Sequence, residues 1–165
     1  MNIFITKEEI EKKVSELALK ISSDHPDGLI TIGVLKGAWV FMADLVRKLT
    51  CPVYIDFIKV SSYKGKETTG EISLSLSPSI SISKKNVLVI EDIVDTGITL
   101  SFLKEHLLKE NPESLKFCCL LDKPERRKKD FTPDYIGFTI PDKFVVGYGL
   151  DCNEEYRNLP YIAVV

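Results

Sequence analysis

The chain has 165 residues, of which 44% are hydrophobic and 28% are charged, and its formal net charge is −2. These values fit one domain, residues 1–165, with a buried core, and they exclude the broad positive field typical of nucleic-acid-binding proteins. The cysteines lack zinc-type spacing, no signal-peptide pattern opens the chain, and no apolar run approaches the ~20 residues of a membrane span. We therefore expect a cytoplasmic protein with reduced thiols.

The first part of the chain predicts a helix, a strand and a second helix. Thr6 and Glu9 form a capping box at the start of an amphipathic helix predicted over about residues 7–23. The continuous apolar run Leu29–Leu35 predicts a strand that is buried on both faces, as in a parallel sheet. Apolar side chains then recur on one helical face, at Ala38, Phe41, Met42, Leu45 and Leu49.

Strands and one further helix alternate through the rest of the chain. The segment after Cys51 begins a strand, residues 64–70 predict a polar, mobile loop, and residues 71–77 alternate like an exposed strand. A buried strand (Val87–Ile90), a helix around Leu103 and a strand (Ser114–Lys123) follow. Short β segments at residues 135–140 and 144–151 predict a small C-terminal hood. This order favours an α/β fold with a central, mostly parallel, twisted sheet flanked by helices.

The stretch VLVIEDIVDTGITL, residues 87–100, carries the most specific chemistry. Ligands of open α/β sheets bind beyond the carboxyl ends of the strands. Backbone amides of residues 96–99 would face an anion at a helix N-terminus, and Gly97 permits close approach. Glu91 and Asp92 suit sugar hydroxyls or hydrated Mg²⁺. A ribose 5-phosphate would satisfy both halves, and a solvated strand-end loop is the alternative.

This stretch resembles the phosphoribosyl-pyrophosphate signature of type I phosphoribosyltransferases. That signature has two acids, a third acid three residues later, Thr-Gly and a second hydroxyl residue. The matched residues are Glu91, Asp92, Asp95, Thr96, Gly97 and Thr99, with Ile98 inside the same loop. Human-type enzymes carry lysine where this chain has Ile98, so the resemblance is to bacterial members.

Further segments resemble hypoxanthine-guanine phosphoribosyltransferases, and the likeness covers the chain from about Leu29 onward. The segments are LKGAWVFMADL, SSYKGKETTGEI, LLDK and IPDKFVVGYGLDCNEEYRNLPYIAVV. The resemblance implies a type I phosphoribosyltransferase fold and a purine salvage reaction. Hypoxanthine or guanine would react with phosphoribosyl pyrophosphate to give IMP or GMP and pyrophosphate.

The resemblance also implies how the donor is bound. Mg²⁺ is the implied cofactor, with Glu91 and Asp92 at the ribose diol and its metal and Asp151 near a second metal. The implied pyrophosphate-binding residues are Leu35, Lys36, Gly37 and Arg157. Ser62 and Tyr63 would begin a loop that closes over the site. A homodimer or homotetramer is implied, with no nucleic acid or membrane as partner.

The implied purine pocket and catalytic residue follow from the same match. Asp95 is the candidate catalytic residue, because its carboxylate can exchange a proton with purine N7. Lys123 would donate to purine O6, Phe144 would stack on the base, and Val145 would present backbone groups to it. Asp151 would lie at the edge of this pocket, and Ile93 and Leu150 are candidate apolar walls.

Simpler interpretations remain open for several of these residues. Asp95 can be a helix N-cap, Lys36 a solvated lysine, Arg157 a member of a rim salt bridge, and Phe144 a core residue. The basic segment after Lys123, PERRKKDFTPD, is typical of a solvated loop. One alternative function is a phosphoribosyl-pyrophosphate-sensing, RNA-binding regulator of the same fold, and another is a related enzyme for adenine, xanthine or uracil.

Overall fold

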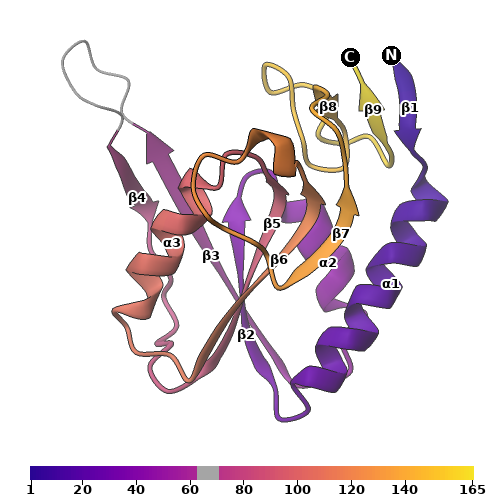
Figure 1. The fold of residues 1–165 in the computed structure, drawn as a ribbon. Coiled ribbons are helices and arrows are strands. Elements are labelled where there is room, and N and C mark those ends of the chain that lie inside the picture. Colours follow the sequence, from indigo (N-terminus) through magenta and orange to yellow (C-terminus); the bar gives the residue numbers. More distant parts are fainter. Residues whose placement is uncertain (63–70) are drawn as a thin grey trace.

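The computed structural model describes residues 1–62 and 71–165. Its central sheet has six strands in the order β4-β3-β2-β5-β6-β7 (Figure 1). Neighbouring strands are parallel except for β4, which runs antiparallel to β3. The strands are β2 (Leu29–Leu35), β3 (Val53–Ser62), β4 (Ile72–Leu76), β5 (Asn86–Val94), β6 (Ser114–Asp122) and β7 (Tyr135–Thr139). The predicted α/β class with a mostly parallel sheet is confirmed.

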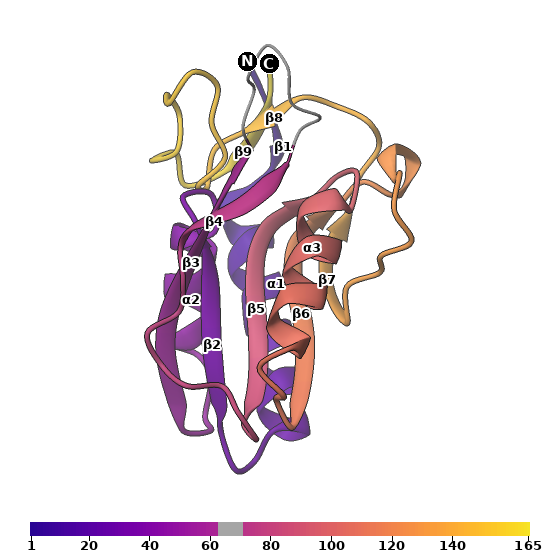
Figure 2. The same ribbon diagram turned by 90° about the vertical axis from the view of Figure 1, so that its left-hand side faces the viewer.

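Helices cover both faces of this sheet (Figure 2). On one face α1 (Lys7–Asp24) and α2 (Trp39–Val46) share an apolar core with alternate residues of β5 and β6. On the other face α3 (Ile98–Leu108) packs on the intervening residues. The predicted capping box starts α1, since the Glu9 amide donates to Thr6 Oγ1 at 3.2 Å and the Thr6 amide donates to Glu9 Oε2 at 2.7 Å. None of the described helices is long and apolar enough to cross a membrane.

A second, three-stranded antiparallel sheet forms the hood above one end of the central sheet (Figure 1). Its order is β1 (Asn2–Ile5), β9 (Ile162–Val164) and β8 (Val145–Val146). The predicted hood is thus built from C-terminal strands together with β1 from the other end of the chain, whereas the segment 135–140, which was predicted to belong to the hood, forms β7 of the central sheet. The Tyr148 hydroxyl donates to Asp44 Oδ2 at 2.5 Å and fastens the hood to α2.

Candidate active site

The carboxyl ends of β2, β5 and β6 lie next to one another at the hood end of the sheet. A cavity of about 540 Å³ opens there. Its walls come from the turn after β2, the end of β5, the start of α3 and the hood, with Leu35, Gly37, Asp92, Thr99, Asp151 and Arg157 among them. Residues predicted from separate parts of the sequence thus meet at one cavity.

Two carboxylates of β5 form part of this cavity. The strand continues to Val94, so Glu91 and Asp92 lie within it, and the prediction that it ends at Ile90 was wrong. Burial raises the pKa of Glu91, and the charge of Asp92 raises it further. Burial also raises the pKa of Asp92, against hydrogen bonds and the charge of Arg157. A Cβ atom at Gly37 would overlap the Asp92 carboxylate, so only glycine fits at this position.

The donor set suits a magnesium ion that is completed by a substrate. Mg²⁺ in phosphate-handling sites takes one or two protein carboxylates together with waters and phosphate oxygens. The buried, paired carboxylates of Glu91 and Asp92 fit this requirement. Among the described residues no group of three or more His, Cys, Asp or Glu side chains gathers into one cluster. Asp151 lines the same cavity as Glu91 and Asp92, and its role at a second metal stays a prediction.

The loop after β5 leads into an open helix end. Gly97 is the N-cap of α3 with φ 79° and has no side chain to cap the helix, and the Ile98 amide makes only a long hydrogen bond, 3.4 Å, to Thr96 Oγ1. The alternative that Asp95 serves as the N-cap was therefore wrong. A hollow of about 110 Å³ is bordered by Asp95, Thr96, Gly97 and Thr99. Since the first amides of a helix lack intrahelical acceptors, this hollow can receive an anion.

Arg127 braces this loop from behind, a role that the sequence analysis missed. Its Nη1 donates to the Asp95 carbonyl at 2.9 Å and its Nε to the Phe131 carbonyl at 2.8 Å. Its Nη2 contacts Asp122 Oδ1 at 2.5 Å, and both side chains are largely buried. The interpretation of this basic segment as solvated was wrong for Arg127.

Arg126 faces the candidate catalytic residue. Its Nε donates to Asp95 Oδ1 at 3.0 Å, and its Nη1 lies 3.7 Å from Asp142. The same Asp142 carboxylate lies 3.8 Å from Lys123 Nζ. Lys123 is only 7% exposed and follows β6 directly, so it is a buried cation at the strand end. These intramolecular pairs engage the arginines of the basic segment, which does not favour an RNA-binding surface there.

Ion pairs hold the opposite wall of the site together. Lys36 Nζ lies 2.8 Å from Glu154 Oε2. Arg157 Nη2 lies 3.0 Å from Glu154 Oε1 and 3.0 Å from Asp151 Oδ1, and its Nη1 donates to the Gly149 carbonyl at 2.8 Å. Arg157 therefore joins a rim ion-pair network, one of the interpretations left open. The peptide bond between Leu35 and Lys36 is cis.

The residues around the predicted base pocket are placed as follows. Val145 is buried on β8, whereas Phe144 is 57% exposed, so the alternative of a core role for Phe144 was wrong. Leu150 belongs to the core that α1 and α2 share, and Ile93 packs against that core. Ser62 ends β3, while Tyr63 and the predicted loop 64–70 lie outside the described residues.

Known proteins with similar sequences are phosphoribosyltransferases. The family model of the phosphoribosyl transferase domain matches residues 4–153, and the chain belongs to this family. The hypoxanthine-guanine phosphoribosyltransferase of Bacillus subtilis is 47% identical over 99% of this chain and 92% of that protein. That of Aquifex aeolicus is 44% identical over 100% of this chain and 94% of that protein.

Solved structures that are similar to this chain come from the same family as the similar sequences. A crystal structure of a hypoxanthine-guanine phosphoribosyltransferase from Bacillus anthracis superposes with a TM-score of 0.95 at 53% identity. The match covers 100% of this chain and 98% of that chain. The resemblance found in the sequence is confirmed, and the fold is that of the type I phosphoribosyltransferases. The chain is a transferase.

Proposed function

We propose that the chain converts hypoxanthine and guanine, with phosphoribosyl pyrophosphate, into IMP and GMP with release of pyrophosphate. The observation that carries the proposal is the cavity that joins the buried acids of β5 to the uncapped N-terminus of α3. A ribose ring that bridges these features would have its diol at the acids and its 5′-phosphate at the amides. The named relatives support the same donor and the same bases.

The leaving pyrophosphate requires compensation of negative charge. Arg157 supplies a cation on the wall opposite α3, Lys36 lies at the neighbouring hollow that shares Leu35 and Arg157 with this cavity, and Gly37 allows the chain to approach closely. Glu91 and Asp92 would hold one Mg²⁺ and Asp151 would hold another. When bound, these ions neutralise the charge that develops on pyrophosphate as its bond to the ribose breaks.

Asp95 is proposed to exchange a proton with purine N7 while N9 attacks the ribose. Arg127 fixes the backbone of Asp95 by binding its carbonyl, whereas the exposed contact of Arg126 with the carboxylate can give way to a bound base. A fixed backbone helps to position the carboxylate toward that base. General acid–base help of this kind contributes roughly 10²–10⁴-fold to a rate.

Lys123 is proposed to select 6-oxopurines. The lysine ammonium has three donors and no acceptor, so it can bind O6 and cannot accept from the amino group of adenine. Because Lys123 is almost fully buried, a donor facing a donor there costs ~1–3 kcal/mol or more. Phe144 offers an exposed ring for stacking, and Val145 offers backbone polar groups at the edge of the base.

The test compares five bases in the wild type and in Lys123→Ala. With phosphoribosyl pyrophosphate and Mg²⁺ saturating, initial rates are measured for hypoxanthine, guanine, xanthine, adenine and uracil. We expect hypoxanthine and guanine to exceed adenine by roughly 10²-fold in the wild type, and the gap to narrow in the variant. An equal fall for hypoxanthine and adenine in Lys123→Ala would mean that the lysine supports the shape of the pocket.

The need for a metal ion is tested separately. Excess EDTA should abolish turnover, and full activity in EDTA would remove the metal from the reaction.

We also propose that the protein is a cytoplasmic homodimer or homotetramer. Trp39, Ile55 and Phe57 are large apolar side chains that are 50%, 51% and 37% exposed. Ile55 and Phe57 alternate on β3, and Phe57 approaches Gly33 beside Met42 of α2, so they share the α2 side of the sheet. An exposed apolar surface of this kind suits a second copy of the chain. Light scattering coupled to size exclusion measures the mass, and a monomer at all concentrations would contradict this proposal.

A further inference from the structure

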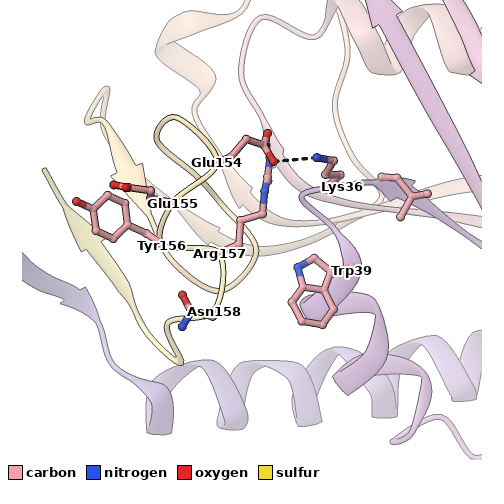
Figure 3. Close-up of a pocket in the computed structure, with 8 residues that line it drawn as sticks. Lys36, Trp39, Glu154, Glu155, Tyr156, Arg157 and Asn158 are labelled. Carbon is pink, nitrogen blue, oxygen red and sulfur yellow. Dashed lines mark hydrogen bonds and ion pairs between the residues drawn. The ribbon is translucent and has the colours of Figure 1, made fainter.

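Glu154 joins the two cations of the proposed pyrophosphate site. Its Oε2 lies 2.8 Å from Lys36 Nζ, and its Oε1 lies 3.0 Å from Arg157 Nη2. Figure 3 shows the carboxylate between these two side chains, on the rim of a hollow of about 710 Å³. Each carboxylate oxygen therefore contacts a different cation, as two oxygens of a pyrophosphate would.

The carboxylate is ionised in this arrangement. Lys36 and Arg157 both lie within 3.0 Å of it, and two neighbouring cations favour the charged form of a carboxylate. The protein thus presents its own anion to the cations that the proposed function assigns to the substrate. Pyrophosphate can reach those cations fully only when the carboxylate gives them up.

The interaction is suited to displacement. The side chains of Lys36 and Glu154 are 54% and 62% exposed, and exposed ion pairs are weak because water competes for both partners. The loop does not depend on this side chain for its shape, because the Glu154 amide donates to Asp151 Oδ2 at 2.9 Å. Arg157 also keeps Asp151 and the Gly149 carbonyl as partners.

We propose that Glu154 sets the affinity of the pyrophosphate site by competing with the substrate for Lys36 and Arg157. This inference rests on the proposed function, which assigns pyrophosphate to these cations. In the free protein the carboxylate occupies both cations. When the donor binds, the carboxylate moves aside, and when pyrophosphate leaves it returns. Weaker product binding and faster product release follow from this exchange.

The test measures the affinity for pyrophosphate in the presence of Mg²⁺, by calorimetry, for Glu154→Gln and Glu155→Gln. The amide keeps the size of the side chain but removes its charge. Glu155 lies in the same loop, lines the same hollow and pairs with no cation in the described part of the chain, so it controls for net charge. We expect Glu154→Gln to bind pyrophosphate about three- to fivefold more tightly, the size of an exposed ion pair. The fold-change in affinity for Glu155→Gln should be less than half as large as that for Glu154→Gln.

The sign of the change decides between competing roles. Weaker binding in Glu154→Gln would mean that Glu154 organises the cations, and an equal gain in both variants would mean a general charge effect; either result overturns the proposal. Lys36→Met separates this inference from the proposed function. If Lys36→Met leaves pyrophosphate binding unchanged, the assignment of the site is wrong. If Lys36→Met weakens binding while Glu154→Gln does not strengthen it, only the competition is wrong.

A double variant gives the final control. In Lys36→Met/Glu154→Gln the gain from removing the carboxylate should shrink, because one of the cations it occupies is gone. A full gain in the double variant would show that Glu154 acts without Lys36 and would overturn the mechanism. Thermal unfolding of each variant confirms that the protein remains folded.

Discussion

The two walls of the active-site cavity are supported in opposite ways. The wall that carries the loop after β5 is braced by Arg127, whose guanidinium is largely buried and whose partners are two backbone carbonyls and a carboxylate. The wall that carries Arg157 is joined to Lys36 of the neighbouring hollow through Glu154, mostly at the exposed rim. A buried brace fixes a position before the ligand arrives, whereas an exposed ion pair can be exchanged for a ligand. One wall would therefore keep its shape, whereas the other is the wall that we propose exchanges its internal contacts for the substrate.

The largest effect is expected when the buried brace is removed. Arg127→Met would leave the buried Asp122 carboxylate without its cation and two carbonyls without donors. Breaking such a pair costs about 3–5 kcal/mol of unfolding free energy. Arg127→Lys keeps the charge but loses the forked guanidinium group, so its loss of unfolding free energy should lie between zero and that of Arg127→Met. Urea unfolding measures the loss.

Lys128→Met is the matched control, because Lys128 is exposed in the same segment. It should stay within about 0.5 kcal/mol of the wild type. If Arg127→Met is no less stable than Lys128→Met, the loop is not braced from behind and the contrast between the walls disappears.

The second effect concerns the side chain on the braced loop. Asp95→Asn keeps an acceptor for Arg126 and nearly the same shape but cannot exchange the N7 proton. We expect kcat with hypoxanthine to fall by roughly 10²-fold or more while the KM for phosphoribosyl pyrophosphate changes little. Steady-state rates measure both constants. A kcat within about twofold of the wild type would assign the proton transfer elsewhere.

The smallest effect contrasts two glutamates whose pKa values shift in opposite directions. Burial raises the pKa of Glu91 above its usual 4.5, so the metal-free folded state binds this proton more tightly than the unfolded state. Its contribution to stability therefore falls as pH rises above about 4.5. The pKa of Glu154 is lowered, so its stabilising contribution is present above about 4.5 and is lost as pH falls below that value.

Stability curves against pH in EDTA test this contrast. The stability of the wild type relative to Glu91→Gln should decline with rising pH, and its stability relative to Glu154→Gln should increase with pH in the acid range and remain small. For a chain of this size, each kcal/mol corresponds to roughly 2–4 °C in Tm. Parallel stability curves for the two variants would mean that ionisation of the buried acid and of the rim acid affects stability in the same way.

Local patterns in the sequence were enough to predict most of the central sheet. The capping box at Thr6 and the apolar run Leu29–Leu35 act over a few residues, and both predictions are confirmed. The end of β5 was predicted too early because charged residues at 91 and 92 look like a loop. Tertiary contacts override that signal, since the strand continues to pair with β6 up to Val94.

Features that depend on distant partners were not predictable from local patterns. Strand β1 is short and half exposed, and its partner β9 lies at the other end of the sequence. Arg127 lies in a run of charges that has the composition of a solvated loop, yet its partners include Asp95 and Phe131. Long-range pairing of this kind leaves no periodic signal in the sequence.

The pairing of β1 with β9 affects the order in which the parts of the chain fold. Closing the hood joins the two ends of the chain, so its loop-closure entropy is larger than that of the neighbouring pairs in the central sheet. We therefore expect the hood to form late in folding and to open first in partial unfolding. Val145 lies on β8 of this hood, whereas the phosphate-side loop follows β5 in the middle of the sheet. On the proposed assignment, a partly opened molecule would thus keep the phosphate-side loop and Lys123, which follows β6, but would lose the backbone groups of Val145 at the edge of the base.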